Sequence, residues 1–189
     1  EKMIVSLVDD EDWKDVWGVP GYQVSNYGRC ASFWKGDKIL GFQKMVGGLR
    51  HYKSKNHNYR GYQHCAARLK RKLYLEETYP LSYYNKLPAN PDRVDKRGNI
   101  LVYMPIHKLV MWHFNPLDKN PEQIGISKEE WDSMPERARQ IIMQCMEINH
   151  IDHDQENNAV WNLEYVTKVE NIAAYHKQFR GTDKFKRNK

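Results

Sequence analysis

A run rich in Tyr, Val and Trp extends from residue 13 to residue 32 and is interrupted repeatedly by turn residues. The interruptions are Gly18, Pro20-Gly21 and Asn26-Tyr27-Gly28. Aromatic and β-branched residues favour strands, whereas Gly, Pro and Asn favour the tight turns that join them. The pattern predicts a small β module in this part of the chain.

The next predicted elements are two strands and a helix. Residues 62–69 and 100–104 have the composition of strands, whereas Pro80, Pro88 and Pro91 prevent the intervening residues from forming one long helix. A helix is predicted over residues 106–114, because apolar residues recur there at helical spacing and Asn115-Pro116 stops it. The recurring positions are Leu109, Val110, His113 and Phe114.

A second helical region is predicted from residue 127 onward. Ser127 followed by Glu130 fits a capping box, which satisfies the first backbone N–H groups of a helix. After Pro135, apolar residues form one stripe at helical spacing, which indicates a face in the core or against a partner. The stripe consists of Ala138, Ile141, Ile142, Cys145 and Met146.

Composition limits the class of protein. The chain has 189 residues, of which 40% are hydrophobic, and this suffices for the core of one or two small domains. The mean hydropathy is −0.85 and no uncharged apolar run approaches about 20 residues, so no membrane-spanning helix is expected. Three cysteines lie far apart without a CxxC pair, which favours reduced thiols and a cytoplasmic location.

The net charge of +6 is distributed unevenly. Residues 35–72, here called the basic zone, carry 11 Lys and Arg and 1 Asp, whereas residues 73–170 carry 10 basic and 16 acidic side chains. Tyr, Asn and Gln are interleaved with these cations, a mixture suited to phosphates and base edges. A nucleic acid is the expected partner, with a solvated basic face as the alternative. The residues expected to contact DNA are Lys35, Lys44, Arg50, Lys53, Lys55 and Arg60.

The segment from residue 148 to residue 171 is unusually rich in Asn, Asp and His. Residues 148–151 and 163–166 are predicted to form two strands on either side of a polar loop. Thr167 is suited to cap a helix that follows the second strand. The sequence therefore predicts a strand, loop, strand and helix unit.

In such a unit, Asn149 and His150 on the first strand can face Asn171 in the first turns of the helix. Oxygen ligands suit a hard cation such as Mg²⁺, which keeps several waters and takes few protein ligands. A neutral imidazole near the cation can deprotonate a water molecule. The expectation is that an imidazole and two oxygen ligands converge on one point.

These residues resemble the HNH endonucleases, and most closely the phage and intron homing endonucleases of that class. In the polar segment the resemblance rests on Asn149-His150-Ile151-Asp152, Asn157-Asn158, Asn162 to Thr167 and Asn171. Ile106 to Val110 and Phe114 resemble the lead-in helix of the family. A second resemblance, near the N-terminus, is to the nuclease-associated modular motif of these enzymes. It rests on Trp13 to Val16, Gly21 to Arg29 and Ser32.

The resemblance implies an α+β fold in which a β-rich N-terminal DNA-binding module precedes a ββα-metal nuclease domain. The implied function is divalent-metal-dependent hydrolysis of phosphodiester bonds in double-stranded DNA, by nicking or cutting. The boundaries that it suggests are residues 1–72 for the β-rich basic region, 73–99 for an irregular insertion, 100–177 for the nuclease domain and 178–189 for a basic tail.

The resemblance also assigns roles to individual residues. It implies that His150 is the general base, that Asn149 and Asn171 bind Mg²⁺ or Mn²⁺, and that Asn162 braces the loop and orients the site. Family members often carry Asp where this chain has Asn149, so the site has one negative charge fewer. Strand alternation points Asp152 the same way as His150, which makes Asp152 a candidate supporting group behind the ligands.

Other residues and other functions were weighed against this interpretation. His107 is expected to be a packed residue of its helix, His153 is a weaker candidate than His150, and Asn157 and Asn158 are expected to act as turn formers without chemistry. One alternative function is a DNA-binding regulator or packaging factor that keeps the fold without catalysis. The other is a structural zinc protein, although the spacing fits no tetrahedral pattern. Its ligands would be His51, His57, His64 and Cys65.

Overall fold

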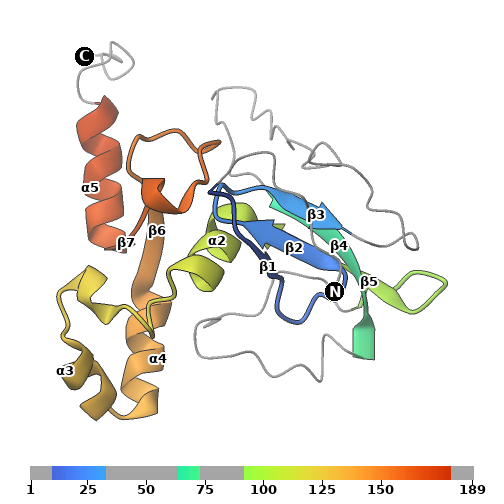
Figure 1. Cartoon of the computed structure of the whole chain (residues 1–189), viewed down its shortest axis with the longest axis horizontal. Coiled ribbons are helices and arrows are strands. Elements are labelled where there is room, and N and C mark those ends of the chain that lie inside the picture. The colour runs from blue at the N-terminus through green and yellow to red at the C-terminus, as the bar shows by residue number, and fades with distance from the viewer. Residues whose placement is uncertain (1–9, 33–63, 73–91, 180–189) are drawn as a thin grey trace, which may run out of the picture.

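The N-terminal module is an antiparallel meander of three short strands, as the sequence predicts. The computed structural model describes residues 10–32, 64–72 and 92–179. Its first three strands are β1 (Trp13–Asp15), β2 (Tyr22–Ser25) and β3 (Cys30–Ser32), paired in that order. The chain turns between them at the predicted Gly and Asn positions, and the meander lies beside the second sheet in Figure 1.

The second sheet joins two strands that are distant in sequence. β4 (His64–Lys70) pairs antiparallel with β5 (Asn99–Pro105), and β5 continues directly into helix α2 (Ile106–Phe114). Both strands and the helix were predicted. Residues 73–91, which form most of the predicted insertion, lie outside the described residues, and residues 95–98 make the turn that leads into β5.

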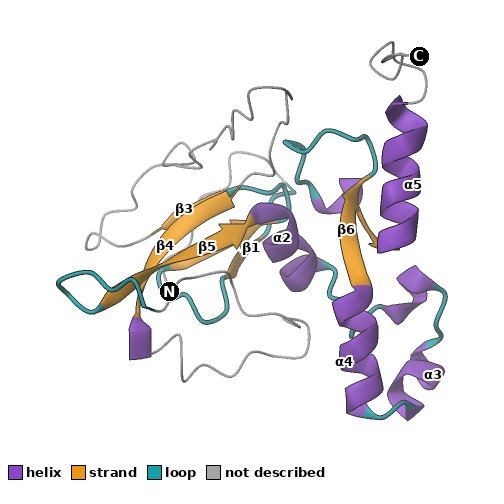
Figure 2. Ribbon diagram, turned by 180° about the vertical axis from the view of Figure 1, so that it is seen from behind, coloured by secondary structure: helices purple, strands orange, loops and turns teal. Residues whose placement is uncertain are grey.

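Helix α2 is followed by a 3-10 helix, η1 (Pro121–Ile124), and then by two short α-helices. Helix α3 (Lys128–Ser133) begins as predicted, because the Oγ of Ser127 accepts a hydrogen bond from the backbone N–H of Glu130 at 3.2 Å. Helix α4 (Glu136–Cys145) then runs into the strand that carries the candidate site, as Figure 2 shows.

The predicted apolar stripe of α4 lies only partly in the core, and the partner alternative stays a prediction. Ile141 is 47% exposed and Cys145 is also exposed, whereas Met143, which lies off the stripe, is fully buried. The helix ends at Cys145, and Met146 is already the first residue of a strand. Helical spacing therefore does not describe the last position of the stripe, and α4 turns a different face to the core.

The last elements form the predicted strand, loop, strand and helix unit. Strand β6 (Met146–His150) pairs antiparallel with β7 (Leu163–Thr167), with η2 (Val160–Asn162) before β7 and helix α5 (Lys168–Phe179) after it. The helix start is a capping box: the Glu170 carboxylate accepts from the N–H of Thr167 at 2.7 Å, and Thr167 Oγ1 accepts from the N–H of Glu170 at 3.3 Å.

A single apolar cluster connects the N-terminal module with α2 and the β6–β7 sheet. Helix α2 lies between these parts in Figures 1 and 2, and Leu109 and Val110 are fully buried within it. Val24 of β2 and Ile148 of β6 belong to the same cluster. No helix among the described residues is long and apolar enough to cross a membrane.

His113 at the end of α2 links the helix to the N-terminal module. Its Nδ1 donates to the carbonyl of Leu109 at 2.7 Å, while its Nε2 accepts from the backbone N–H of Trp17 at 3.4 Å. Lys14 donates to the carbonyl of His113 at 2.9 Å. Burial lowers the pKa of His113 below its usual value, so the ring is neutral and can donate and accept at the same time.

Candidate functional site

The polar residues of β6 are divided between the two faces of the β6–β7 sheet. Side chains alternate along a strand, so His150 shares a face with Ile148, and Asn149 shares the other face with Glu147. The His150 face is buried and faces α2, whereas the Asn149 face is covered by α5 (Figure 1). Asn171, which bonds to Glu147, therefore lies on the side of the sheet that carries Asn149, and the His150 ring lies on the other side; convergence of the three on one point stays a prediction.

Asn158 fixes the orientation of the His150 ring. His150 Nε2 lies 3.0 Å from the amide oxygen of Asn158, and the amide nitrogen of Asn158 donates to the carbonyl of Glu156 at 3.2 Å. Because the amide nitrogen is committed to a carbonyl, the group facing His150 is an acceptor, and Nε2 must carry the proton. The neutral ring then has its lone pair on Nδ1.

The surroundings of His150 keep it neutral near physiological pH. The residue is only 3% exposed, and this burial lowers its pKa, while the bond to Asn158 and the charges of Asp152 and Asp154 act in the opposite direction. A second imidazole, His107 of α2, lies with its ring centre 5.7 Å from that of His150. His107 is therefore buried in its helix, as predicted, but directly beside the candidate base.

The loop after β6 is organised around the carboxylate of Asp152. This carboxylate accepts hydrogen bonds from the side-chain amides of Asn157 at 2.7 Å and Asn162 at 2.9 Å, and from the N–H of Asp154 at 2.8 Å. These bonds, led by the one from Asn157, lower the pKa of Asp152. Asp152 therefore acts on the loop.

Asn162 closes the same loop from the side of β7. Its amide nitrogen donates to the carbonyl of Asn157 at 2.8 Å, and its amide oxygen accepts from the backbone N–H of Asp152 at 3.1 Å. The residue is buried, with 6% exposure. This is the bracing position that the resemblance implies for Asn162.

On the α5 side of the sheet, two amides are each bound to a carboxylate. The amide nitrogen of Asn149 donates to Glu164 on the paired strand at 2.8 Å, and that of Asn171 on α5 donates to Glu147 at 2.5 Å. Both amide oxygens are thereby turned away from the carboxylates. Among the described residues, neither amide oxygen accepts a hydrogen bond.

This donor set fits a hard divalent cation. Two neutral amide oxygens lie on one face of the sheet, with the charges of Glu147 and Glu164 directly behind them. Within the described part of the chain, no group of three His, Cys, Asp or Glu could hold a metal. A cation with few protein ligands and several waters suits this face better than zinc, which requires a full set of N and S ligands.

Three participants were not predicted from the sequence. Asn158 was expected to be only a turn former, although it is 2% exposed and bound to His150. Glu147 and Glu164 were not singled out at all. The alternation of β6 offered a signal for Glu147, because it places that residue on the same face as Asn149.

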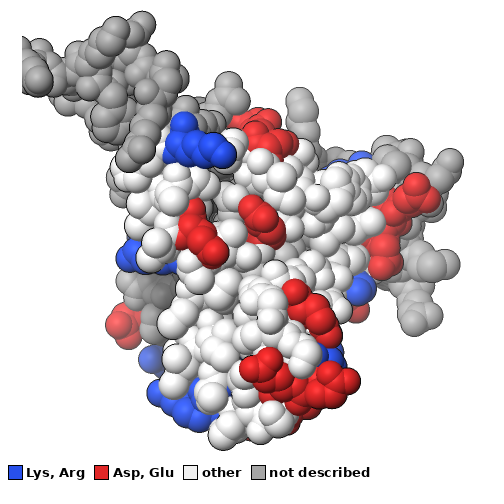
Figure 3. Space-filling view, turned by 90° about the vertical axis from the view of Figure 1, so that its left-hand side faces the viewer, with Lys and Arg blue, Asp and Glu red and all other residues white. Residues whose placement is uncertain are grey.

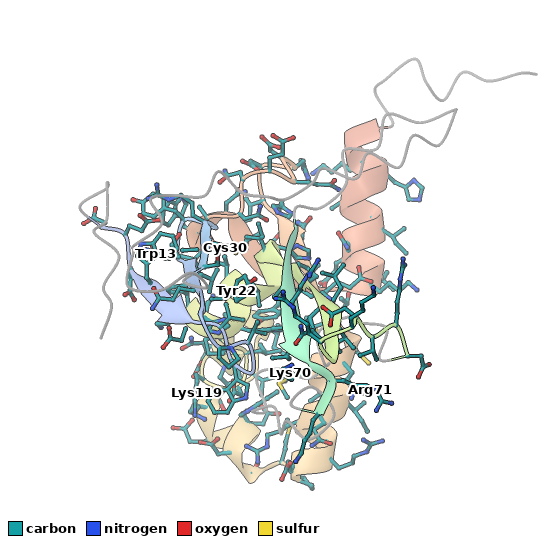
Figure 4. All side chains as sticks on the ribbon, turned by 90° about the vertical axis from the view of Figure 1, so that its right-hand side faces the viewer. Trp13, Tyr22, Cys30, Lys70, Arg71 and Lys119 are labelled. Carbon is teal, nitrogen blue, oxygen red and sulfur yellow. The ribbon has the colours of Figure 1, made fainter. Side chains whose placement is uncertain are left out.

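All six basic residues expected to contact DNA lie outside the described residues, as do His51 and His57. Four cations of the basic zone fall within the described range, and Figure 4 shows Lys70 and Arg71 at the end of β4. The face in Figure 3 shows acidic as well as basic side chains, and the described residues form no continuous basic surface on this face. The basic zone thus stays a prediction from the sequence.

Comparisons with known proteins give one distant structural likeness. No family model and no curated protein matches the chain. One similar solved structure concerns DNA binding and cleavage by the HNH homing endonuclease I-HmuI. Its TM-score to this chain is 0.42, and the two sequences are 18% identical. The similarity covers 88% of this chain and 59% of that one, so the chain spans about three fifths of the length of the protein that it matches.

Proposed function

We propose that this protein is a divalent-metal-dependent endonuclease of the HNH type that hydrolyses phosphodiester bonds in double-stranded DNA. The observation that carries the proposal is the arrangement at the end of β6. His150, held as a single neutral tautomer by Asn158, directly follows Asn149, whose face also receives Asn171 from α5. A base and two hard oxygen donors are thus supplied by one strand, loop, strand and helix unit.

The division between two faces is compatible with one reaction. Asn149 and His150 are consecutive at the end of β6, so we place the phosphate across this end of the strand, where groups from both faces can approach it. His150 would approach that phosphate with a water on one side, and the amide oxygens of Asn149 and Asn171 would lie on the other. The placement of the phosphate is part of the proposal.

In the proposed reaction, Nδ1 of His150 takes a proton from water as the water oxygen attacks phosphorus. A new P–O bond forms while the bond to the 3′ oxygen breaks, and the departing oxygen takes a proton from solvent. Asn158 continues to accept from Nε2 when the ring becomes cationic, and the charges of Asp152 and Asp154 favour that cation. When bound, Mg²⁺ or Mn²⁺ would stabilise the negative charge that develops on the phosphate and on the departing oxygen.

The defining experiment is incubation with supercoiled plasmid, with and without Mg²⁺ or Mn²⁺. Nicking or linearisation that requires the added ion supports the proposal. Binding of the plasmid without cleavage under any metal condition would instead support a DNA-binding regulator with the same fold. Metal analysis of the purified protein separates both from the zinc protein, which would retain zinc tightly.

Double-stranded DNA is proposed to be held mainly through phosphates by the basic zone. Counterion release makes the logarithm of the DNA-binding constant fall with the logarithm of the salt concentration, with a slope of about −0.9 per phosphate neutralised. Neutralising Lys53, Lys55 and Arg60 together should therefore make this slope shallower by about 2 to 3. Specific and random duplexes should be weakened alike. Binding isotherms over a range of salt concentrations test this, and an unchanged slope would show that DNA is held elsewhere.

A further inference from the structure

A turn of the N-terminal module contacts the loop that orients His150. The turn is Asn26-Tyr27-Gly28, between β2 and β3, and the loop residues that it meets are Asn158, Val160 and Trp161. These contacts join segments more than 120 residues apart in the sequence.

The first contact is a backbone hydrogen bond. The N–H of Val160 donates to the carbonyl of Asn26 at 2.8 Å. Asn26 is itself fixed by Asp12, whose carbonyl accepts from the N–H of Asn26 at 3.1 Å and whose N–H donates to the Asn26 side chain at 3.0 Å. The acceptor for Val160 is therefore held firmly within the N-terminal module.

The second contact is aromatic. The rings of Tyr27 and Trp161 meet edge to face, with centres 4.6 Å apart and an interplanar angle of 85°. This geometry is a favourable one for aromatic pairs. Trp161 is nevertheless 57% exposed, so the contact depends on Tyr27 and not on burial in the core.

The third contact is the closest approach between the turn and the loop. Gly28 has a φ of 78°, and a Cβ placed on it would lie 2.5 Å from the Cβ of Asn158 and 2.8 Å from the Asn158 carbonyl oxygen. Atoms do not approach to such distances without movement of the backbone. The glycine thus permits the turn to lie directly against the residue that accepts from His150.

We infer that the turn 26–28 is a positioning element for His150, so that the N-terminal module completes the candidate active site. The turn fixes the backbone of Asn158, and Asn158 fixes the tautomer and direction of the imidazole. The inference rests on the proposed function only in taking His150 as the base. Misplacement of a reacting group by about 1 Å can lower the rate about 10²-fold, so a shift of this backbone contact should lower the cleavage rate.

The test compares Gly28→Ala with Gly125→Ala in the full-length chain. Gly125 has the same φ of 78°, but a Cβ there meets nothing within 4 Å, so this control carries the backbone strain without the contact. Gly28→Ala should lower the cleavage rate about 10- to 10²-fold while leaving DNA affinity unchanged, because only the base is displaced. Gly125→Ala should keep the wild-type rate.

The second readout is the tautomer of His150, measured by ¹⁵N NMR of the imidazole without metal or DNA. The wild type and Gly125→Ala should show a proton fixed on Nε2. Gly28→Ala should show a mixture of tautomers, as should Asn158→Ala, which removes the acceptor directly. A merely structural role of the turn would lower stability without changing the tautomer.

A second pair of variants breaks the contact from the side of the loop, in case Gly28→Ala disturbs the module itself. Val160→Pro replaces the N–H with a methylene group that would meet the carbonyl of Asn26. Ala159 has φ −63° and ψ 139°, and Val160 begins η2, so the local backbone accepts proline. Val160→Ala keeps the N–H and is the matched control.

The expected result is that Gly28→Ala and Val160→Pro lose rate and tautomer order while both controls retain them. The inference is overturned if Gly28→Ala behaves like Gly125→Ala, or if all four variants lose rate equally. His150→Ala tests the proposed function separately. Were that variant fully active, the base assignment would fail, while the tautomer data would still decide whether the turn positions the ring.

Discussion

His150 and the two candidate ligands occupy opposite faces of β6, and the structure holds them in different ways. On the α2 face, His150 is 3% exposed, its ring is bonded to Asn158, and the loop behind it is closed by Asn162. On the α5 face, Asn149 and Asn171 are only partly buried, and each is tied to a carboxylate.

The difference indicates that position is secured by packing on one face and by charge on the other. A buried ring bonded to one neutral amide has one tautomer and little freedom, which suits a proton acceptor. Partly exposed amides with carboxylates behind them suit exchange with water and with a hydrated cation. Substitutions on the two faces should therefore fail in different ways, one in rate and the other in metal dependence.

The largest effect is expected on the buried face. His150→Ala removes the proton acceptor and leaves every contact of the α5 face intact, so the cleavage rate should fall by about 10² to 10⁴ at any metal concentration. DNA affinity should stay close to that of the wild type. The measurement is single-turnover nicking across a Mn²⁺ titration, and a variant that keeps more than about a tenth of the rate contradicts the assignment.

A smaller and different effect is expected on the α5 face. Asn171→Ala removes an oxygen donor, so the Mg²⁺ concentration for half-maximal cleavage should rise about 10- to 100-fold. High Mn²⁺ should restore much of the rate, because the base is intact. Metal titration followed by both cleavage and thermal stabilisation checks this, and a loss that metal cannot relieve would place Asn171 outside the cation site.

Much of this arrangement could be predicted because it depends on local sequence. Turn residues at Pro20-Gly21 and Asn26 to Gly28 define the meander, and the Thr167–Glu170 capping box places the start of α5 at the predicted residue. The position of Asn149 and Asn171 on the same side of the sheet follows from the same short unit. Each of these features involves residues that are close in sequence.

What the sequence did not show depends on the path of the loop after β6 and on packing against other elements. Asn158 looks like any turn residue until the fold brings it within 3.0 Å of His150 and against Gly28. Ile141 looks apolar enough for a core position, but α4 packs through Met143, and Ile141 is 47% exposed. Asn149 and His150 lie on opposite faces for a local reason, since consecutive strand residues alternate in direction.

The role of charge on the α5 face can be isolated with Glu147→Gln. The glutamine amide keeps an acceptor for Asn171 but removes the negative charge. The Mg²⁺ concentration for half-maximal cleavage should therefore rise by about 3- to 10-fold, which is less than the effect of removing the whole supporting side chain. Glu129→Gln, on α3, removes the same charge away from the site and is the matched control. Equal effects of the two variants would mean that the net charge of the protein, and not the bond to Asn171, sets metal affinity.

The smallest expected effect is a shift in the pH dependence of cleavage. Burial lowers the pKa of His150 below the ordinary value of about 6.5, and the ring must be neutral to accept a proton. The rate should therefore rise with pH, reach half its maximum below about pH 6.5, and stay level above it. The midpoint should be the same in Mg²⁺ and Mn²⁺, because His150 lies on the face opposite the ligands. A rate that is flat from roughly pH 5.5 to 8, or a midpoint that moves with the metal, would assign the proton transfer to the α5 face instead.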